Sequence, residues 1–148
     1  MNSIVSVRRH SYDEPKILHI EFTVSSDSFA GNIDIYCGVN DLVEIGTGLR
    51  NFPKGLNDEY IFEYGSDDPK ERSYRYFVLR AYMIDSVGHG AIQFIINNNT
   101  VEPYEGMCRF SIQADAAAIN RLGEKFLMFS ELRELEFEWS PRLDEVVY

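Results

Sequence analysis

The chain has 148 residues, 45% of them hydrophobic and 14% aromatic, with 14 Lys and Arg against 24 Asp and Glu and a formal charge of −10. This composition excludes intrinsic disorder, and the length predicts one domain spanning residues 1–148. No apolar run approaches the ~20 residues of a membrane helix, and the N-terminus lacks the long apolar segment of a secretory signal. We therefore expect a cytoplasmic protein with no membrane partner.

Three strands are predicted before the first helix, starting with a short one near Ile4–Val7. Apolar and polar residues alternate over Ile17–Val24 and again over Phe29–Cys37, which is the period of half-buried strands and predicts a hairpin. Asp41 can then cap a helix that ends at Pro53. The apolar face of this helix is formed by Leu42, Ile45, Leu49 and Phe52.

The second half of the chain begins with four predicted strands, at Glu59–Tyr64, Tyr74–Asp85, Gly90–Asn97 and Gly106–Gln113. Asp115 can cap a second amphipathic helix that continues to about Glu131. After it, Leu135, Phe137 and Trp139 alternate with glutamates, which is typical of an edge strand.

Strands outnumber helices in this order, and short turns join successive strands. The fold class predicted is α+β, with a mainly antiparallel sheet of about six to seven strands and two amphipathic helices packed on one face. A doubly wound nucleotide-binding fold needs regular alternation of strands and helices, so we exclude it.

Motifs that carry chemistry are missing from the sequence. It has no GxSxG elbow, no Walker sequence and no GxGxxG after a strand. The three histidines, His10, His19 and His89, have no metal-ligand spacing, and Cys37 and Cys108 read as reduced thiols packed in strands. We therefore expect no enzyme activity, no cofactor and no metal.

The negative charge is concentrated in two segments. Residues 58–71 hold six acids and one lysine, and residues 131–148 hold six acids and two arginines. If the two segments are neighbours in space, they form an acidic face that suits a basic protein partner, whereas nucleic acid requires a basic face. Alternatively, the acidic side chains only cover the solvent-exposed surface and bind no partner. The partner-binding residues predicted on this basis are Asp67, Asp68, Glu134, Glu136 and Glu138.

The arrangement of motifs resembles a group of small bacterial proteins, some of them immunity proteins of polymorphic toxin systems. The segments that carry the resemblance are Leu18–Val24, Phe29–Gly31, Asp41–Pro53, Gly88–Gly90 and Ala118–Gly123. The resemblance implies a non-enzymatic protein that binds and blocks a toxin domain. It supplies no binding residues.

Two other functions stay open at this point. A cavity between sheet and helices would make the chain a small-ligand-binding protein or an enzyme. An exposed apolar sheet face would make it a self-associating structural module. The oligomeric state is not predicted by the sequence.

Overall fold

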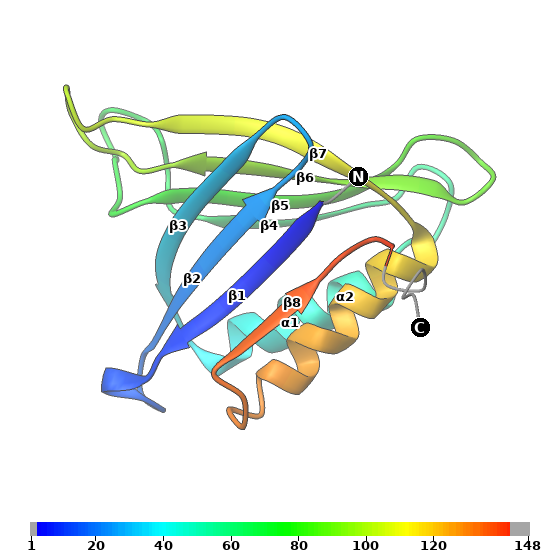
Figure 1. Ribbon diagram of the computed structural model, residues 1–148, viewed down its shortest axis with the longest axis horizontal. Helices are drawn as coiled ribbons and strands as arrows, with labels where there is room; N and C mark the ends of the chain where they lie inside the picture. The colour runs from blue at the N-terminus through cyan, green and yellow to red at the C-terminus, as the bar shows by residue number, and fades with distance from the viewer. Residues whose placement is uncertain (1–2, 143–148) are drawn as a thin grey trace.

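The computed structural model describes residues 3–142. Two α-helices, a short 3-10 helix and eight strands follow one another along this part of the chain (Figure 1). In chain order they are β1 (Ile4–His10), η1 (Ser11–Asp13), β2 (Leu18–Ser25), β3 (Ala30–Cys37), α1 (Val39–Arg50), β4 (Glu59–Tyr64), β5 (Tyr76–Met83), β6 (His89–Asn97), β7 (Met107–Asp115), α2 (Ala116–Phe129) and β8 (Glu136–Trp139).

The strands form two antiparallel sheets of four. Sheet A has the order β3-β2-β1-β8, and sheet B has the order β4-β5-β6-β7. The predicted α+β class with antiparallel pairing is confirmed, but the single sheet of six to seven strands is replaced by two sheets. The reason is that β1 pairs on both sides, with Val7 opposite Phe22 of β2 and Phe137 of β8, and so recruits the last strand into the first sheet.

The core lies between the two sheets, where the alternation of each strand directs its apolar residues. Phe22 of sheet A stacks on Phe77 of sheet B with ring centroids 4.4 Å apart, so the inner faces are in direct contact. No helix within residues 3–142 is long and apolar enough to cross a membrane. The assignment of one domain to residues 1–148 stays a prediction, and residues 143–148 of the acidic tail lie outside the described residues.

The two helices pack against each other where each carries a glycine. A Cβ atom on Gly123 of α2 would lie 2.4 Å from the backbone nitrogen of Arg50 and 2.7 Å from the carbonyl oxygen of Gly46. The glycines that weaken both helices therefore permit their close approach. The α2 helix also contacts sheet A, because its Phe126 ring lies 5.2 Å from the ring of Phe137.

Candidate functional site

The five acids predicted to bind a partner are divided between two distant places. Asp67 and Asp68 lie in the loop between β4 and β5, and Glu136 and Glu138 lie on β8, with Glu134 just before it. Tyr74 and Arg75 fix that loop to Asp34 of β3, through a 2.7 Å hydrogen bond and a 3.4 Å ion pair.

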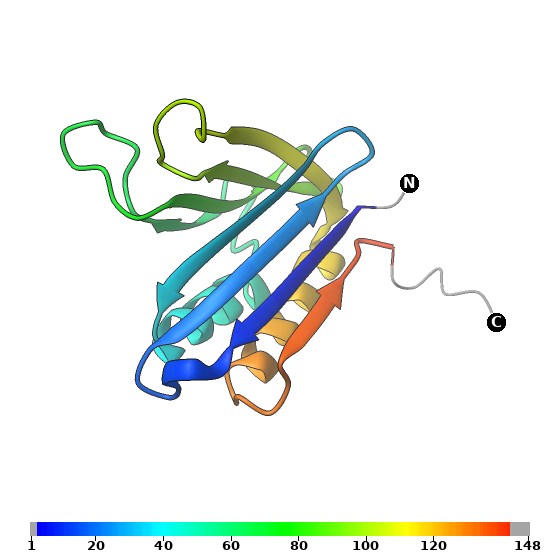
Figure 2. The same cartoon turned by 60° about the vertical axis from the view of Figure 1, so that its left-hand side comes forward.

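Sheet A separates the two groups, because β3 and β8 are its opposite edges. Three strand spacings, about 14 Å, lie between these edges. Figure 2 shows the β4–β5 loop and β8 on opposite sides of the molecule. The charge of Glu136 is also compensated within the chain, since Arg8 donates to its carboxylate at 2.9 Å. The single acidic surface that motivated the prediction is therefore not formed by these residues, and their role as contacts stays a prediction.

A different surface combines arginine, tyrosine and neutral polar groups. We call it the arginine–tyrosine face and define it by the outward residues of β5, β6 and β7 within 76–82, 91–97 and 107–113. Pairing across sheet B places Arg80 beside Gln93 and Ser111, and Val78 beside Ile95 and Arg109. The members of the face are Tyr76, Val78, Arg80, Tyr82, Ala91, Gln93, Ile95, Asn97, Met107, Arg109, Ser111 and Gln113.

This face contains two arginines and no carboxylate, although the whole chain has a charge of −10. The nearest acids on the same side of the sheet, Glu59 and Glu63, belong to the edge strand β4. Beyond Gln113, the next outward residue is Asp115, which caps α2 by accepting a 2.8 Å hydrogen bond from the backbone nitrogen of Ala118. Because Arg80 forms an ion pair with Glu59 at 2.7 Å, Arg109 is the arginine of this face whose charge no described carboxylate compensates.

The polar side chains of the face are held in place by one another. The Arg80 guanidinium carbon lies 4.3 Å from the centre of the Tyr82 ring, and its Nε donates to Glu59 at 2.7 Å. The hydroxyl of Tyr82 is 3.1 Å from that of Ser111, and the hydroxyl of Tyr76 donates to Glu63 at 2.7 Å. Burial, together with this carboxylate, raises the pKa of Tyr76 to about 12, so its hydroxyl stays protonated at neutral pH.

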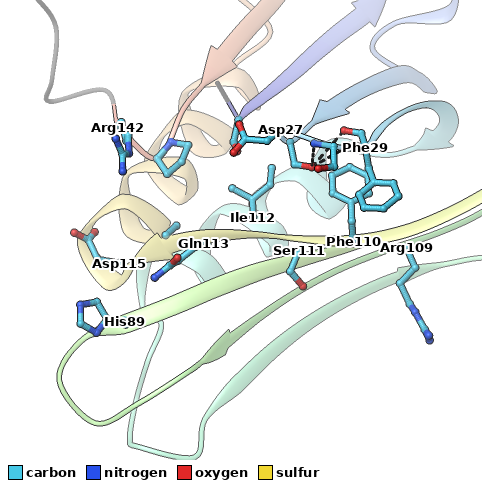
Figure 3. Close-up of a pocket in the computed structure, with 15 residues that line it drawn as sticks. Asp27, Phe29, His89, Arg109, Phe110, Ser111, Ile112, Gln113, Asp115 and Arg142 are labelled. Atoms are coloured by element: carbon cyan, nitrogen blue, oxygen red, sulfur yellow. Dashed lines mark hydrogen bonds between the residues drawn. The ribbon is translucent and has the colours of Figure 1, made fainter. Parts of the chain in front are cut away.

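A groove of about 860 Å³ runs along the open edge of β7 (Figure 3). Its opposite wall comes from the β2–β3 turn, where the exposed Phe29 stacks on Phe110 with centroids 6.0 Å apart. Arg109 points away from this aromatic pair, toward the outward side of the sheet (Figure 3). The groove therefore meets the arginine–tyrosine face along β7.

A row of rings crosses the outward side of sheet A. The His19 ring lies 4.9 Å from the His10 ring and 4.4 Å from the Tyr36 ring, between centroids. Both histidines contact carboxylates, His10 with Glu21 at 2.9 Å and His19 with Asp34 at 2.7 Å. These contacts hold neighbouring strands together, and we assign the row a structural role.

Asp34 links this row to the β4–β5 loop. Burial raises the pKa of Asp34, but hydrogen bonds from His19 and Tyr74 and the charge of Arg75 outweigh burial and hold the pKa below its ordinary value. His89 is the first residue of β6 and contacts Asp85 at 2.6 Å. Within the part of the chain that the structure describes, no three His, Cys, Asp or Glu side chains are placed to hold a metal ion.

No protein-family model and no curated protein matches the sequence. Two solved structures have a similar course of the chain. One is the plant transcriptional regulator PBF-2, with 11% identity and a TM-score of 0.47 over 88% of this chain and 76% of that one. The other is WHY1 from Arabidopsis thaliana, with 11% identity and a TM-score of 0.48 over 88% of this chain and 84% of that one.

These findings correct the predicted function and partner. The matches are to a transcriptional regulator and WHY1 rather than to a toxin inhibitor, so the prediction of a basic protein partner with no nucleic acid is wrong. The geometry supplies the physical reason, because the acidic segments lie apart while the carboxylate-free surface is on sheet B. The likeness is too distant to place the chain in a family.

The residues of the arginine–tyrosine face were missed because charge was counted along the sequence. A signal was present in β5, where Phe77, Leu79 and Ala81 alternate with tyrosine, valine and arginine. One side of that strand is uniformly apolar, and the other combines two aromatic rings with a cation. Arg109 has the same signal, since buried Phe110, Ile112 and Ala114 alternate with arginine, serine and glutamine in β7. Only the pairing of β7 with β6 shows that Arg109 and Arg80 share one face.

Proposed function

We propose that this chain binds single-stranded nucleic acid on the arginine–tyrosine face. The observation that carries the proposal is the composition of this face: two arginines, two tyrosines and neutral hydrogen-bonding groups without a carboxylate, in a chain of charge −10. Binding of single strands combines cations for the phosphates with planar groups for the bases. The face supplies both on a four-stranded antiparallel sheet.

Stacking is the interaction expected to contribute most. An unpaired base can stack on an aromatic ring or on a guanidinium plane, and each such contact contributes about 1–3 kcal/mol. Arg80 and Tyr82 already lie against each other, and hydrogen bonds to Glu59 and Ser111 restrict both side chains. Little side-chain entropy is then lost when a base binds beside them.

The same face favours a single strand over a duplex. Duplex binding depends mainly on many phosphate contacts, and two arginines provide few. Exposed bases also present their hydrogen-bonding edges, which the side chains of Gln93, Ser111 and Gln113 can meet as donors or acceptors. We therefore expect modest affinity, weak sequence preference and discrimination against double strands.

The proposal is tested with a fluorescently labelled oligodeoxythymidylate and a duplex of equal length, by fluorescence anisotropy. Tyr82→Ala removes one stacking ring, and roughly 5- to 150-fold weaker binding is expected. Tyr104→Ala is the matched control, because Tyr104 is 75% exposed and lies in the loop between β6 and β7. Equal losses in both variants, or tighter binding of the duplex, would count against the proposal.

Three predictions from the sequence are not tested by the structure. The cytoplasmic location, the lack of enzyme activity and the resemblance to immunity proteins stay predictions. None of them is needed for binding at the arginine–tyrosine face.

A further inference from the structure

The β7 strand is the edge of sheet B and directs a set of backbone groups outward. The backbone nitrogen of Ala116 donates to the Gly88 oxygen, and that of Asn98 donates to the Gly106 oxygen. In the β6–β7 register, Gly88 lies directly opposite Ala116 and Asn98 directly opposite Gly106. Because hydrogen-bonded pairs alternate along an antiparallel ladder, the even-numbered residues of β7 bond to β6. The backbone groups of Arg109, Ser111 and Gln113 therefore point toward the open edge.

This edge has room beside it. The groove of about 860 Å³ separates β7 from the β2–β3 turn, and Phe110 and Ile112 line it from the β7 side (Figure 3). An edge strand with unpaired backbone groups is a template for another strand. Edge strands in proteins are usually protected by proline, by lysine or by a segment that covers them. The β7 strand contains no proline and no lysine.

The charges on β7 point to the strand that completes it. Arg109 and Asp115 both lie on the outward side of β7, three residues before and three residues after Ile112. We infer that a second copy of this chain pairs its β7 antiparallel to the first, around a twofold axis at Ile112. Each Arg109 then lies opposite Asp115 of the other copy, and each Ser111 lies opposite Gln113.

The side chains of both residues are available for this pairing. Arg109 is exposed and makes no hydrogen bond or ion pair with the described residues. Asp115 is exposed and uses Oδ1 to cap α2, which leaves its other carboxylate oxygen for a guanidinium. Opposite charges that face each other across strands stabilise the pairing of those strands.

The inner side of β7 is compatible with the same register. Phe110 lies opposite Ala114 of the other copy, so a large side chain meets a small one, and Ile112 meets its own copy at the axis. A register centred on Ser111 instead places Met107 opposite Asp115 and Arg109 opposite Gln113, and it forms no ion pair. The register centred on Ile112 is therefore the one that the charges select.

Pairing in this way joins two copies of sheet B into one eight-stranded sheet. The two arginine–tyrosine faces then lie on the same side of a continuous surface. The inference concerns assembly and does not depend on nucleic-acid binding, so it is tested without nucleic acid.

Sedimentation equilibrium of the full chain, at concentrations up to about 1 mM, measures the association. The wild type is expected to form dimers. Ser111→Pro removes a backbone donor that points to the open edge, so the fold tolerates it while the pairing is lost. The matched control is Ala30→Pro, since Ala30 begins the edge strand β3 of the other sheet; circular dichroism checks that both variants are folded.

A second variant tests the register itself. Arg109→Glu places like charges opposite each other, and dimer formation is expected to weaken roughly tenfold or more. Arg133→Glu makes the same change of charge at an exposed arginine away from β7 and is expected to leave the dimer intact. A wild type that stays monomeric throughout overturns the inference, as does a dimer that persists in Ser111→Pro.

Discussion

The guanidinium carbon of Arg80 lies 4.3 Å from the centre of the Tyr82 ring, on a part of sheet B where no carboxylate intervenes between β5 and β7. This pair presents a cation and an aromatic plane together. Exposed arginine and tyrosine are ordinary in proteins. What distinguishes this pair is a second arginine, Arg109, on the same face of an otherwise acidic chain.

The first prediction concerns salt. Each phosphate neutralised on a single strand contributes about −0.7 to the slope of log K against log salt concentration. Because Arg80 is ion-paired with Glu59, Arg109 alone predicts a slope of about −0.7, and Arg109→Gln should reduce the slope toward zero. Anisotropy titrations at several salt concentrations give both slopes. Arg133→Gln is the control, and a slope that Arg109→Gln leaves unchanged would exclude Arg109 from the phosphate contacts.

The second prediction concerns the contact between the helices. Gly123→Ala inserts a methyl group 2.4 Å from the backbone nitrogen of Arg50, and backbone cannot move aside as a flexible side chain can. The free energy of unfolding should fall by about 1–3 kcal/mol, as is typical of overpacking. Urea denaturation measures the change. Gly55→Ala is the control, because a Cβ atom there meets nothing within 4 Å.

The third prediction concerns Arg9, whose side chain is buried with that of Glu14. Arg9 also donates to the backbone oxygen of Glu134, at 3.0 Å from Nε, and so fixes the segment before β8. Arg9→Ala leaves Glu14 without its cation and should lower the free energy of unfolding by about 3 kcal/mol. The adjacent Arg8→Ala breaks an exposed pair with Glu136 and should lower the free energy of unfolding far less than Arg9→Ala does. Similar losses in the two variants would refute the distinction.

The fourth prediction concerns acid. The pKa of Asp34 is below its ordinary value in the folded chain, so its carboxylate stabilises the fold above the unfolded pKa of about 4. That stabilisation is lost as the pH falls through the folded pKa. Wild type should therefore exceed Asp34→Asn in unfolding free energy at pH 5, and the difference should shrink toward pH 2. Exposed Asp13→Asn serves as the control, and a difference that does not change with pH would contradict the prediction.

Much of the local structure follows from the sequence. The strand Glu59–Tyr64 has the bounds that were predicted, and Asp115 caps α2 as expected. Both depend on neighbouring residues, through alternation in the strand and through one side chain at the start of the helix. The number of sheets depends instead on which strands pair. Val7 faces Phe137, far along the chain, and no local pattern encodes that choice.

The candidate site was not predicted, because it too depends on which strands pair. Counting charge along the chain joined Asp67 with Glu136, which sheet A separates. The face that the structure assembles draws Arg80 and Arg109 from strands separated by β6. Such a face becomes recognisable only when the register of all three strands is known.

Binding of a single strand to the arginine–tyrosine face is tested by titrating the ¹⁵N-labelled chain with an oligodeoxythymidylate and following the chemical shifts of its backbone amides. Binding on the arginine–tyrosine face predicts saturable shifts concentrated in residues 76–82, 91–97 and 107–113. An absence of shifts, or shifts confined to β8 and the β4–β5 loop, would contradict it.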